Sequence, residues 1–211
     1  MDKFTVHRGV AAPLLRPNID TDAIIPSREM KRVSKVGLSE GLFAGWRYME
    51  QTSRTLNPEF VLNQPEYEGT SILLAGSNFG CGSSREHAVW ALKEYGIRAI
   101  IAPSFGTIFR NNCVRNGILP VVLDQVDVQA LADNMRSNPQ HRTVTIDLNA
   151  KHVDAALGCS FGFEIPDNDR EMLLEGLDPI TLTLKRSEEI ADFQQLDRLL
   201  RPWIYLDRVR F

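Results

Sequence analysis

Residues 72–87 read Ile-Leu-Leu-Ala-Gly-Ser-Asn-Phe-Gly-Cys-Gly-Ser-Ser-Arg-Glu-His, an apolar run that turns through glycines into a polar segment. The continuously apolar residues 72–75 predict a strand buried on both faces of a parallel sheet. Beyond the glycines, Ala88, Leu92 and Tyr95 follow at three- and four-residue spacing, which predicts a helix that Gly96 ends. A strand that turns through glycines into a helix leaves backbone N–H groups and the positive end of the helix dipole facing outward, so we expect an anion site here.

The loop lacks the residues that phosphate-binding loops require. Gly82 is followed by two serines rather than by the Lys-Ser/Thr of a P-loop, and Arg85 stands where a dinucleotide fingerprint needs its third glycine. The guanidinium of Arg85 suits bidentate pairing with a carboxylate, and the hydroxyls of Ser83 and Ser84 add hydrogen bonds or a proton acceptor. The sequence therefore favours a small carboxylic acid as ligand. Spacing alone leaves open the alternative that the serines only cap the helix.

Two further apolar runs, residues 98–102 and 119–123, flank a helical pattern over residues 105–116. This β-α-β-α-β alternation predicts an α/β fold with a parallel sheet and puts the glycine loop at the carboxyl ends of the strands, where such folds bind ligands. Residues 126–136 predict another helix and residues 143–148 another strand. From residue 167 onward the chain is more polar and mostly helical in pattern.

Composition restricts the classes of function. The 211 residues are 43% hydrophobic and 24% charged, enough for one substantial core, and the net charge of -3 is spread along the chain. We therefore expect no nucleic-acid partner and no membrane-surface partner. No run approaches the ~20 apolar residues of a membrane span and no signal peptide opens the chain, so we expect a cytoplasmic protein.

The cysteines and one serine motif are further candidate sites. Cys81, Cys113 and Cys159 are widely separated and contain no C-x-x-C pair, so they predict neither a disulfide framework nor a zinc site. Ser160 lies in a G-x-S-x-G motif typical of hydrolases, but the catalytic histidine of that fold follows the serine, and the last histidine here is His152. A hydrolase is therefore not expected.

Several segments together carry a family resemblance, and they occur in order over most of residues 1–125. They are residues 20–26 (Asp-Thr-Asp-Ala-Ile-Ile-Pro), 45–48, 57–63, 80–88 (Gly-Cys-Gly-Ser-Ser-Arg-Glu-His-Ala), 102–105, 111–113 and 116–120. In these segments the chain resembles the small subunits of 3-isopropylmalate dehydratases, in the aconitase superfamily. The resemblance implies a swivelling β/β/α domain, with a mostly parallel sheet flanked by helices, over residues 1–166. Residues 167–211 would form a mainly helical extension packed on this domain or on the partner subunit.

The resemblance also implies an activity: a two-subunit hydro-lyase that isomerises 2-isopropylmalate to 3-isopropylmalate in leucine biosynthesis. The partner would be the large subunit, which carries a four-iron four-sulfur cluster, and this chain would bind no cofactor or metal. By motif position Ser83 would be the catalytic base, while Ser84 and Arg85 would bind the carboxylate of a small dicarboxylate substrate. Asp22 corresponds to a second catalytic segment, although both Asp20 and Asp22 are also typical of residues that cap or turn the chain.

The segment after Pro26 sets substrate preference in this family, and here it departs from the usual pattern. It reads Glu29-Met30-Lys31, where many bacterial relatives have an aromatic-Leu-Lys run. Lys31 is a candidate contact for the distal part of the substrate. A carboxylate that points inward is a poor neighbour for an isopropyl group. A paralogous hydro-lyase acting on another malate homologue, of the citraconate/2-methylmalate or dimethylmalate type, therefore stays open, as does a non-catalytic module that kept the fold.

Overall fold

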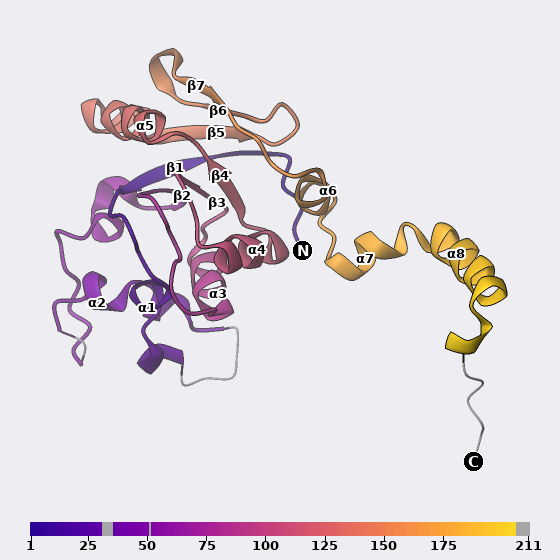
Figure 1. Cartoon of the computed structure of the whole chain (residues 1–211). Helices are drawn as coiled ribbons and strands as arrows, with labels where there is room; N and C mark the ends of the chain where they lie inside the picture. Colours follow the sequence, from indigo (N-terminus) through magenta and orange to yellow (C-terminus); the bar gives the residue numbers. More distant parts are fainter. Residues whose placement is uncertain (31–35, 51, 206–211) are drawn as a thin grey trace. The chain divides into compact units, whose positions relative to one another are not determined.

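The computed structural model describes residues 1–30, 36–50 and 52–205. The chain divides into two compact units, Met1–Gly176 and Leu177–Phe211 (Figure 1). The first unit ends beyond the boundary predicted at residue 166 and includes helix α6 (Asp167–Glu175), whose Leu173 carbonyl accepts a hydrogen bond from the Phe4 amide (2.8 Å). Where the C-terminal extension packs stays a prediction.

The first unit is built on a seven-stranded sheet of order β4-β3-β2-β1-β5-β6-β7. Its strands are β1 (Val6–Leu14), β2 (Thr70–Ala75), β3 (Ala99–Ala102), β4 (Leu119–Val122), β5 (Thr143–Asp147), β6 (His152–Asp154) and β7 (Ser160–Gly162). Strands β1 to β4 pair in parallel, whereas β5, β6 and β7 continue the sheet in antiparallel pairs from the other side of β1. The α/β class is thereby confirmed, but the sheet is mixed and not mostly parallel, because three strand pairs are parallel and three are antiparallel, with β1 joining the two halves.

Helices α3 (Glu86–Tyr95), α4 (Thr107–Asn116) and α5 (Gln125–Ser137) follow β2, β3 and β4 in turn. Figure 1 shows α3 and α4 on one face of the sheet and α5 on the other. Gly96 and Gly117 end α3 and α4 with φ values of 111° and 81°, in the left-handed region that glycine adopts readily. The predicted β-α-β-α-β core is therefore confirmed.

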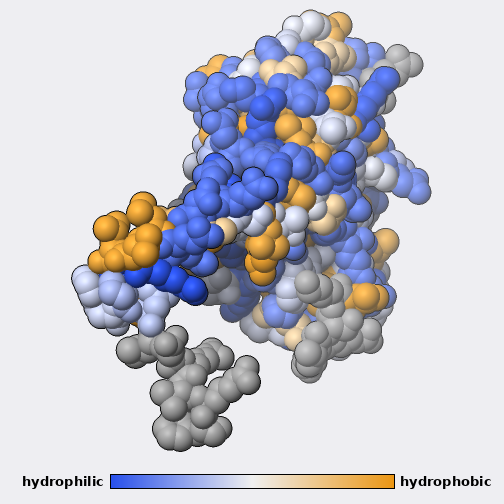
Figure 2. Space-filling view, turned by 90° about the vertical axis from the view of Figure 1, so that its right-hand side faces the viewer, coloured by the Kyte–Doolittle hydropathy of each residue, from blue (hydrophilic) through white to orange (hydrophobic). Residues whose placement is uncertain are grey.

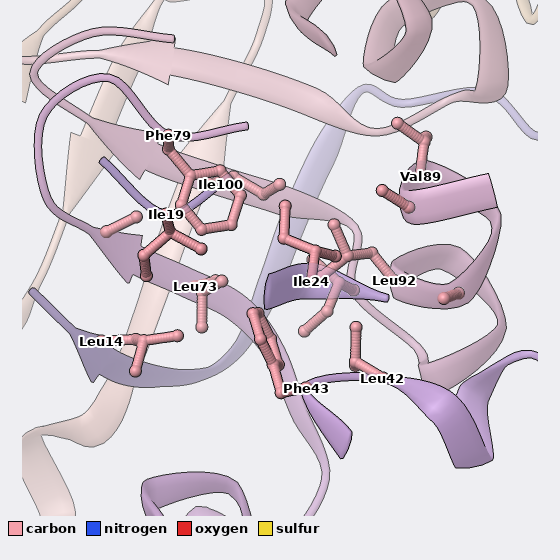
Figure 3. Close-up of a cluster of buried hydrophobic side chains, with 14 of the residues drawn as sticks. Leu14, Ile19, Ile24, Leu42, Phe43, Leu73, Phe79, Val89, Leu92 and Ile100 are labelled. Carbon is pink, nitrogen blue, oxygen red and sulfur yellow. The ribbon is translucent and has the colours of Figure 1, made fainter. Parts of the chain in front are cut away.

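The connection from β1 to β2 packs on this core through short elements. These are α1 (Thr21–Ile24), α2 (Ala44–Arg47) and the 3-10 turns Ser27–Met30, Ser39–Gly41, Val61–Asn63 and Pro65–Tyr67. Ile24 and Phe43 are fully buried with Leu73 of β2 and Leu92 of α3 (Figure 3). Burying such side chains stabilises the fold by roughly 1.5–3 kcal/mol each. The residues around Asp22 are therefore held by the same core as the glycine loop.

The second unit contains α7 (Pro179–Leu184), α8 (Ser187–Leu200) and a 3-10 turn, η7 (Pro202–Ile204). Asp178 caps α7, because its carboxylate accepts a hydrogen bond from the Thr181 amide (2.7 Å). The helical character predicted for this part of the chain is confirmed. Among the described residues, no helix combines the length and the apolar character that a membrane crossing needs.

Candidate functional site

The glycine loop, residues 76–85, leaves the carboxyl end of β2 and is bonded to the chain that leaves both neighbouring strands. On the β1 side, the Gly80 amide donates to the Ile19 carbonyl (2.7 Å). On the β3 side, the Phe79 amide donates to the Ser104 carbonyl (3.0 Å), and the Gly106 amide donates back to Phe79 (2.9 Å). The loop therefore lies at the carboxyl edge of the parallel strands, where the sequence predicted a site.

Two glycines allow the loop to approach the start of α4. Gly80 has a φ of +72°, and a Cβ there would lie 2.7 Å from the Cβ of Phe109 and closer still to its ring. A Cβ on Gly106 would lie 2.5 Å from the Gly80 carbonyl oxygen. Because no side chain fits at either position, the loop packs directly against the Phe109 ring and against the backbone at Gly106.

A cleft of about 370 Å³ opens between these segments. It is lined by residues 80–85 and 105–109, together with Thr21 and Asn78. Both α3 and α4 begin here, and neither has a side-chain cap on its first amides. Two ten-residue helices thus direct the positive ends of their dipoles toward the cleft, which favours a bound anion.

Ser83 and Ser84 are exposed in this cleft. Helix α3 begins at Glu86, with Arg85 at the N-cap position and no capping hydrogen bond from a side chain. The alternative that the serines cap the helix is therefore wrong. The Ser83 carbonyl accepts a hydrogen bond from the Thr21 hydroxyl (2.7 Å), so the backbone of the serine is fixed while its own hydroxyl bonds to no described residue.

Asp22 and Arg85 form an ion pair at the edge of the cleft. Nη1 of Arg85 donates to Oδ1 of Asp22, which also accepts from the Ser27 hydroxyl at 3.3 Å. The hydrogen bond from Arg85 holds the pKa of the Asp22 carboxyl below its usual range. Asp20 instead caps α1 through the Ala23 amide (2.7 Å). Asp20 is therefore the cap of α1, whereas Asp22 pairs with Arg85; a catalytic role for Asp22 stays a prediction.

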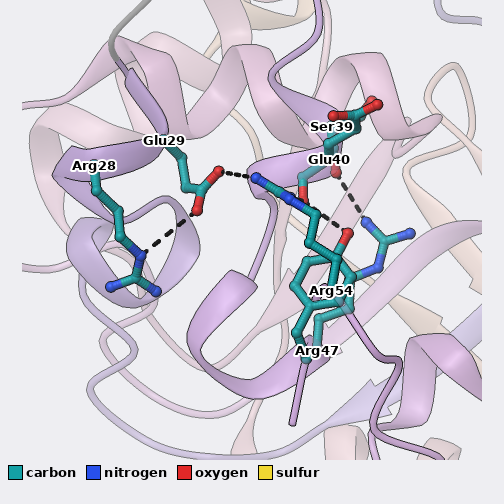
Figure 4. A network of polar contacts seen from close by, with 7 residues as sticks. Arg28, Glu29, Ser39, Glu40, Arg47 and Arg54 are labelled. Atoms are coloured by element: carbon teal, nitrogen blue, oxygen red, sulfur yellow. Dashed lines mark hydrogen bonds and ion pairs between the residues drawn. The ribbon is translucent and has the colours of Figure 1, made fainter. Parts of the chain in front are cut away.

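The side chain of Glu29 pairs with two arginines and does not line the cleft. Its carboxylate pairs with Arg54 (Oε2 to Nη2, 2.5 Å) and with Arg28 (Oε1 to Nε, 3.5 Å), as Figure 4 shows. It packs over Gly41, where a Cβ would lie 2.6 Å from the Cβ of Glu29. Glu29 is not among the residues that line the cleft, so its charge is no argument against an apolar substrate group. Lys31 lies outside the described residues.

Some cleft residues were not singled out from the sequence. Asn78 adopts a φ of 57° and is held by Ser104, whose hydroxyl accepts from the Asn78 amide (2.8 Å), and by the Asn18 side chain (2.9 Å). Ile108, in the first turn of α4, is 53% exposed and offers an apolar surface beside Ser84 and Arg85. No motif marks Ile108 in the sequence. The signal that could have found Ile108 is its place after β3, because ligands bind at the carboxyl edge that parallel strands share.

The three cysteines lie in different surroundings. Cys81 lines the cleft, Cys113 is fully buried in α4, and Cys159 accepts a hydrogen bond from the Asn134 side chain (3.1 Å). Burial raises the pKa of the Cys113 thiol far above its usual value, which disfavours the thiolate that a metal needs. Within the described part of the chain, no three His, Cys, Asp or Glu side chains are placed to hold a metal ion.

The fold does bring a histidine and an aspartate to Ser160, on the exposed hairpin of β6 and β7. The hydroxyl of Ser160 donates to Asp154 (2.6 Å), and Nδ1 of His152 lies 3.3 Å from it. In a hydrolase triad the serine bonds to histidine and the aspartate orients that histidine. Here the aspartate holds the serine, so the arrangement is not that of a nucleophile.

Comparison with known proteins agrees with this geometry. Residues 1–126, which contain the whole cleft, match the family model of the aconitase C-terminal domain. The chain is 68% identical over 207 residues to a 3-isopropylmalate dehydratase small subunit from Cupriavidus necator, covering 98% of this chain and 100% of that protein. A crystal structure of 3-isopropylmalate dehydratase from Methanocaldococcus jannaschii has a TM-score of 0.63 at 27% identity, covering 89% of this chain and 98% of that one.

The fold and the cleft thus define an aconitase-type C-terminal domain, in which the glycine loop and the Asp22 segment face the same opening. The identity to the bacterial small subunit runs through both units of the chain. The chain belongs to the family of 3-isopropylmalate dehydratase small subunits.

Proposed function

We propose that this chain is the catalytic small subunit of a two-subunit hydro-lyase that converts 2-isopropylmalate to 3-isopropylmalate by dehydration and rehydration. One observation carries the proposal: Ser83, Ser84 and Arg85 stand together in a cleft that two helix N-termini open onto. The reaction would take place in the cytoplasm, as part of leucine biosynthesis.

Arg85 and Ser84 would bind a carboxylate of the substrate. The ion pair with Asp22 fixes the guanidinium at one nitrogen, Nη1, and no other Arg85 bond is found among the described residues. The remaining N–H groups are therefore available to an incoming carboxylate. Because Asp22 is itself 53% exposed, the pair is screened by water and stabilises the fold little. Its proposed value lies in orienting Arg85 before the substrate arrives.

Ser83 would take a proton from a substrate carbon in the dehydration and return it in the rehydration. A serine hydroxyl is a weak base in water, so this role needs positive charge that stabilises its alkoxide. The start of α3, the Arg85 guanidinium and the start of α4 supply such charge around the cleft. Because the Ser83 hydroxyl bonds to no described residue, no internal bond has to break before it reacts.

The iron–sulfur cluster of this enzyme class would belong to the large subunit. The cysteines of this chain do not fit it, because Cys113 is buried with a raised pKa and Cys159 contacts Asn134, away from the cleft that Cys81 lines. The complete site would then be shared, with this chain providing the proton acceptor and the carboxylate-binding group.

Ile108 supports a branched alkyl group on the substrate. Its side chain lines the cleft near the start of α4 and is 53% exposed, so it offers apolar surface to a substrate. The carboxylate of Glu29 does not line the cleft and instead pairs with Arg54. We therefore favour isopropylmalate over the smaller 2-methylmalate.

The test is anaerobic turnover of this chain, alone and with its large subunit, on 2-isopropylmalate and 2-methylmalate in parallel. Formation of the conjugated alkene is followed by ultraviolet absorbance. We expect turnover by the pair only, with isopropylmalate preferred. Preference for methylmalate would overturn the substrate assignment, and no turnover of either by a complex with its full cluster content would overturn the reaction.

A further inference from the structure

The second unit carries apolar side chains on its outside. The large ones, between 53% and 81% exposed, are Ile180, Leu184, Phe193, Leu196, Leu199, Leu200, Trp203 and Ile204. A group of apolar side chains, coloured orange, stands at the surface of this unit in Figure 2. Among its described residues the buried one is Asp197, at 7% exposure. A unit with an acid inside and leucines outside has no apolar core of its own, and exposed patches of this kind mark interaction sites.

Asp197 holds the end of this unit in a defined shape. Its carboxylate accepts from Nε of Arg201 (2.5 Å) and from the Tyr205 hydroxyl (2.7 Å), and its carbonyl accepts from the Arg201 amide (2.7 Å). These bonds join η7 to the last turn of α8. Trp203 and Ile204 are therefore held close to the end of α8, and both are exposed, as are Leu199 and Leu200.

The apolar residues of α8 follow a helical stripe. Ile190, Phe193, Leu196 and Leu200 recur at three, three and four residues, which places them on one face. The opposite face carries Ala191, Gln195 and Arg198, all exposed. An isolated 14-residue helix is marginal in water, so such a stripe is typical of a helix that packs against another surface.

The comparisons indicate which kind of chain carries this face. The aconitase C-terminal family model ends at residue 126, so the second unit lies outside the part that carries the cleft. The Cupriavidus small subunit, by contrast, matches 98% of this chain and therefore includes this unit. The segment thus belongs to the separate small subunit and not to the shared domain. A small subunit has a large subunit as its partner, and an exposed apolar surface on it is a candidate contact for that partner.

We propose that the apolar face of α8 and η7 docks into an apolar groove on the large subunit of the dehydratase. The inference rests on the proposed function, which supplies the partner. Glu188, Glu189 and Asp192 make the first half of α8 acidic, so we expect basic residues beside that end of the groove. A tryptophan such as Trp203 is typical of the few residues that supply most of the affinity of such an interface.

The experiment compares two double variants of the full chain, Phe193→Glu with Leu196→Glu on the apolar face and Ala191→Glu with Gln195→Glu on the opposite face. Each adds two carboxylates to the same turns of α8, and Glu is a good helix former, so only the face differs. For the apolar-face variant we expect the Kd for the large subunit to rise about 100-fold or more, since each buried apolar side chain contributes about tenfold or more. The polar-face variant should bind within about threefold of wild type.

The outcomes separate the possible occupants. An unchanged Kd with a lower melting temperature of the isolated apolar-face variant would mean that α8 covers the first unit, and would overturn the proposal. An unchanged Kd with loss of self-association would mean that a second copy covers it, which also overturns it. Turnover at saturating large subunit distinguishes this failure from that of the proposed function, because docking variants should regain the wild-type kcat there.

Discussion

The first and second units of this chain are built on opposite principles. In the first, apolar side chains such as Leu73 and Leu92 are fully buried, and Ser83 and Ser84 stand exposed. In the second, Asp197 is buried and Phe193 and Leu199 are exposed. The first unit is thus ordered by its own core and contains the proposed catalytic residues. The described residues of the second unit are held by local hydrogen bonds, and their exposed apolar surface suits association. The division predicts that substitutions in the two units have separable effects.

The largest effect is expected from Ser83→Ala, which removes the proposed proton acceptor. We expect kcat to fall by about 10²–10⁴-fold at saturating large subunit, as for other general bases. The melting temperature should stay at the wild-type value, since the hydroxyl is exposed and bonds to no described residue. Steady-state kinetics and thermal unfolding measure the two quantities. Ser77→Ala, in the same loop but outside the cleft, is the control and should keep full activity.

The next largest effect is expected from Gly80→Ala, which tests the close packing of the glycine loop against α4. The new Cβ would meet the Phe109 ring at a backbone φ of +72°, so we expect the free energy of unfolding to fall by about 2–4 kcal/mol. Gly96→Ala is matched to it, because Gly96 also has a positive φ but no heavy atom lies within 4 Å of the place its Cβ would take. That control should lose only about 1 kcal/mol. Equal losses of unfolding free energy in the two variants, measured by urea unfolding, would show that the contact with Phe109 contributes nothing beyond the strain of the positive φ.

A smaller effect on substrate preference is expected at Ile108. Shortening it to alanine removes apolar surface from the cleft, so kcat/KM for 2-isopropylmalate should fall about tenfold relative to that for 2-methylmalate. Ile180→Ala, an exposed isoleucine in the second unit, should leave this ratio unchanged. If both substrates lost activity equally, Ile108 would be a structural neighbour and not a contact of the alkyl group.

The smallest effect concerns the Asp22–Arg85 pair and pH. Because Arg85 lowers the pKa of Asp22 in the folded chain, the pair stabilises the fold above the ordinary aspartate pKa of about 3.9 and loses this effect as the pH falls further. With Asp22 half exposed, we expect a few tenths of a kcal/mol, or about 1 °C in melting temperature. Asp22→Asn should therefore melt slightly below wild type at pH 7 and together with it near pH 3. A difference that grows on acidification would contradict this assignment.

The two units also differ in how far the sequence predicts them. Continuous apolar runs predict β2, β3 and β4, and helix stops at Gly96 and Gly117 predict the ends of α3 and α4, because these signals are local. Strand β1 was not predicted, since Arg8, Gly9 and Pro13 interrupt its pattern, and its position is set by pairing with β2 and β5.

In the site, motif position supplied Ser83, Ser84, Arg85 and Asp22. The fold places the first three in one cleft and pairs Asp22 with Arg85. The orientation of Glu29 could not be predicted, because its partner Arg54 lies 25 residues further along the chain. The roles of Asp20 and Asp22 were likewise undecided, since both residue types cap helices and only geometry shows which amide or guanidinium each one meets.

The most direct test of the division between the units is kcat at saturating large subunit for two variants, Ser83→Ala and Phe193→Glu with Leu196→Glu. We expect the first to lose turnover by about 10²–10⁴-fold and the second to reach the wild-type kcat once the large subunit is in excess. Wild-type turnover by Ser83→Ala would show that the first unit does not provide the proton acceptor through Ser83. A lasting loss of kcat in the second variant would show that the second unit contributes to catalysis as well as to association.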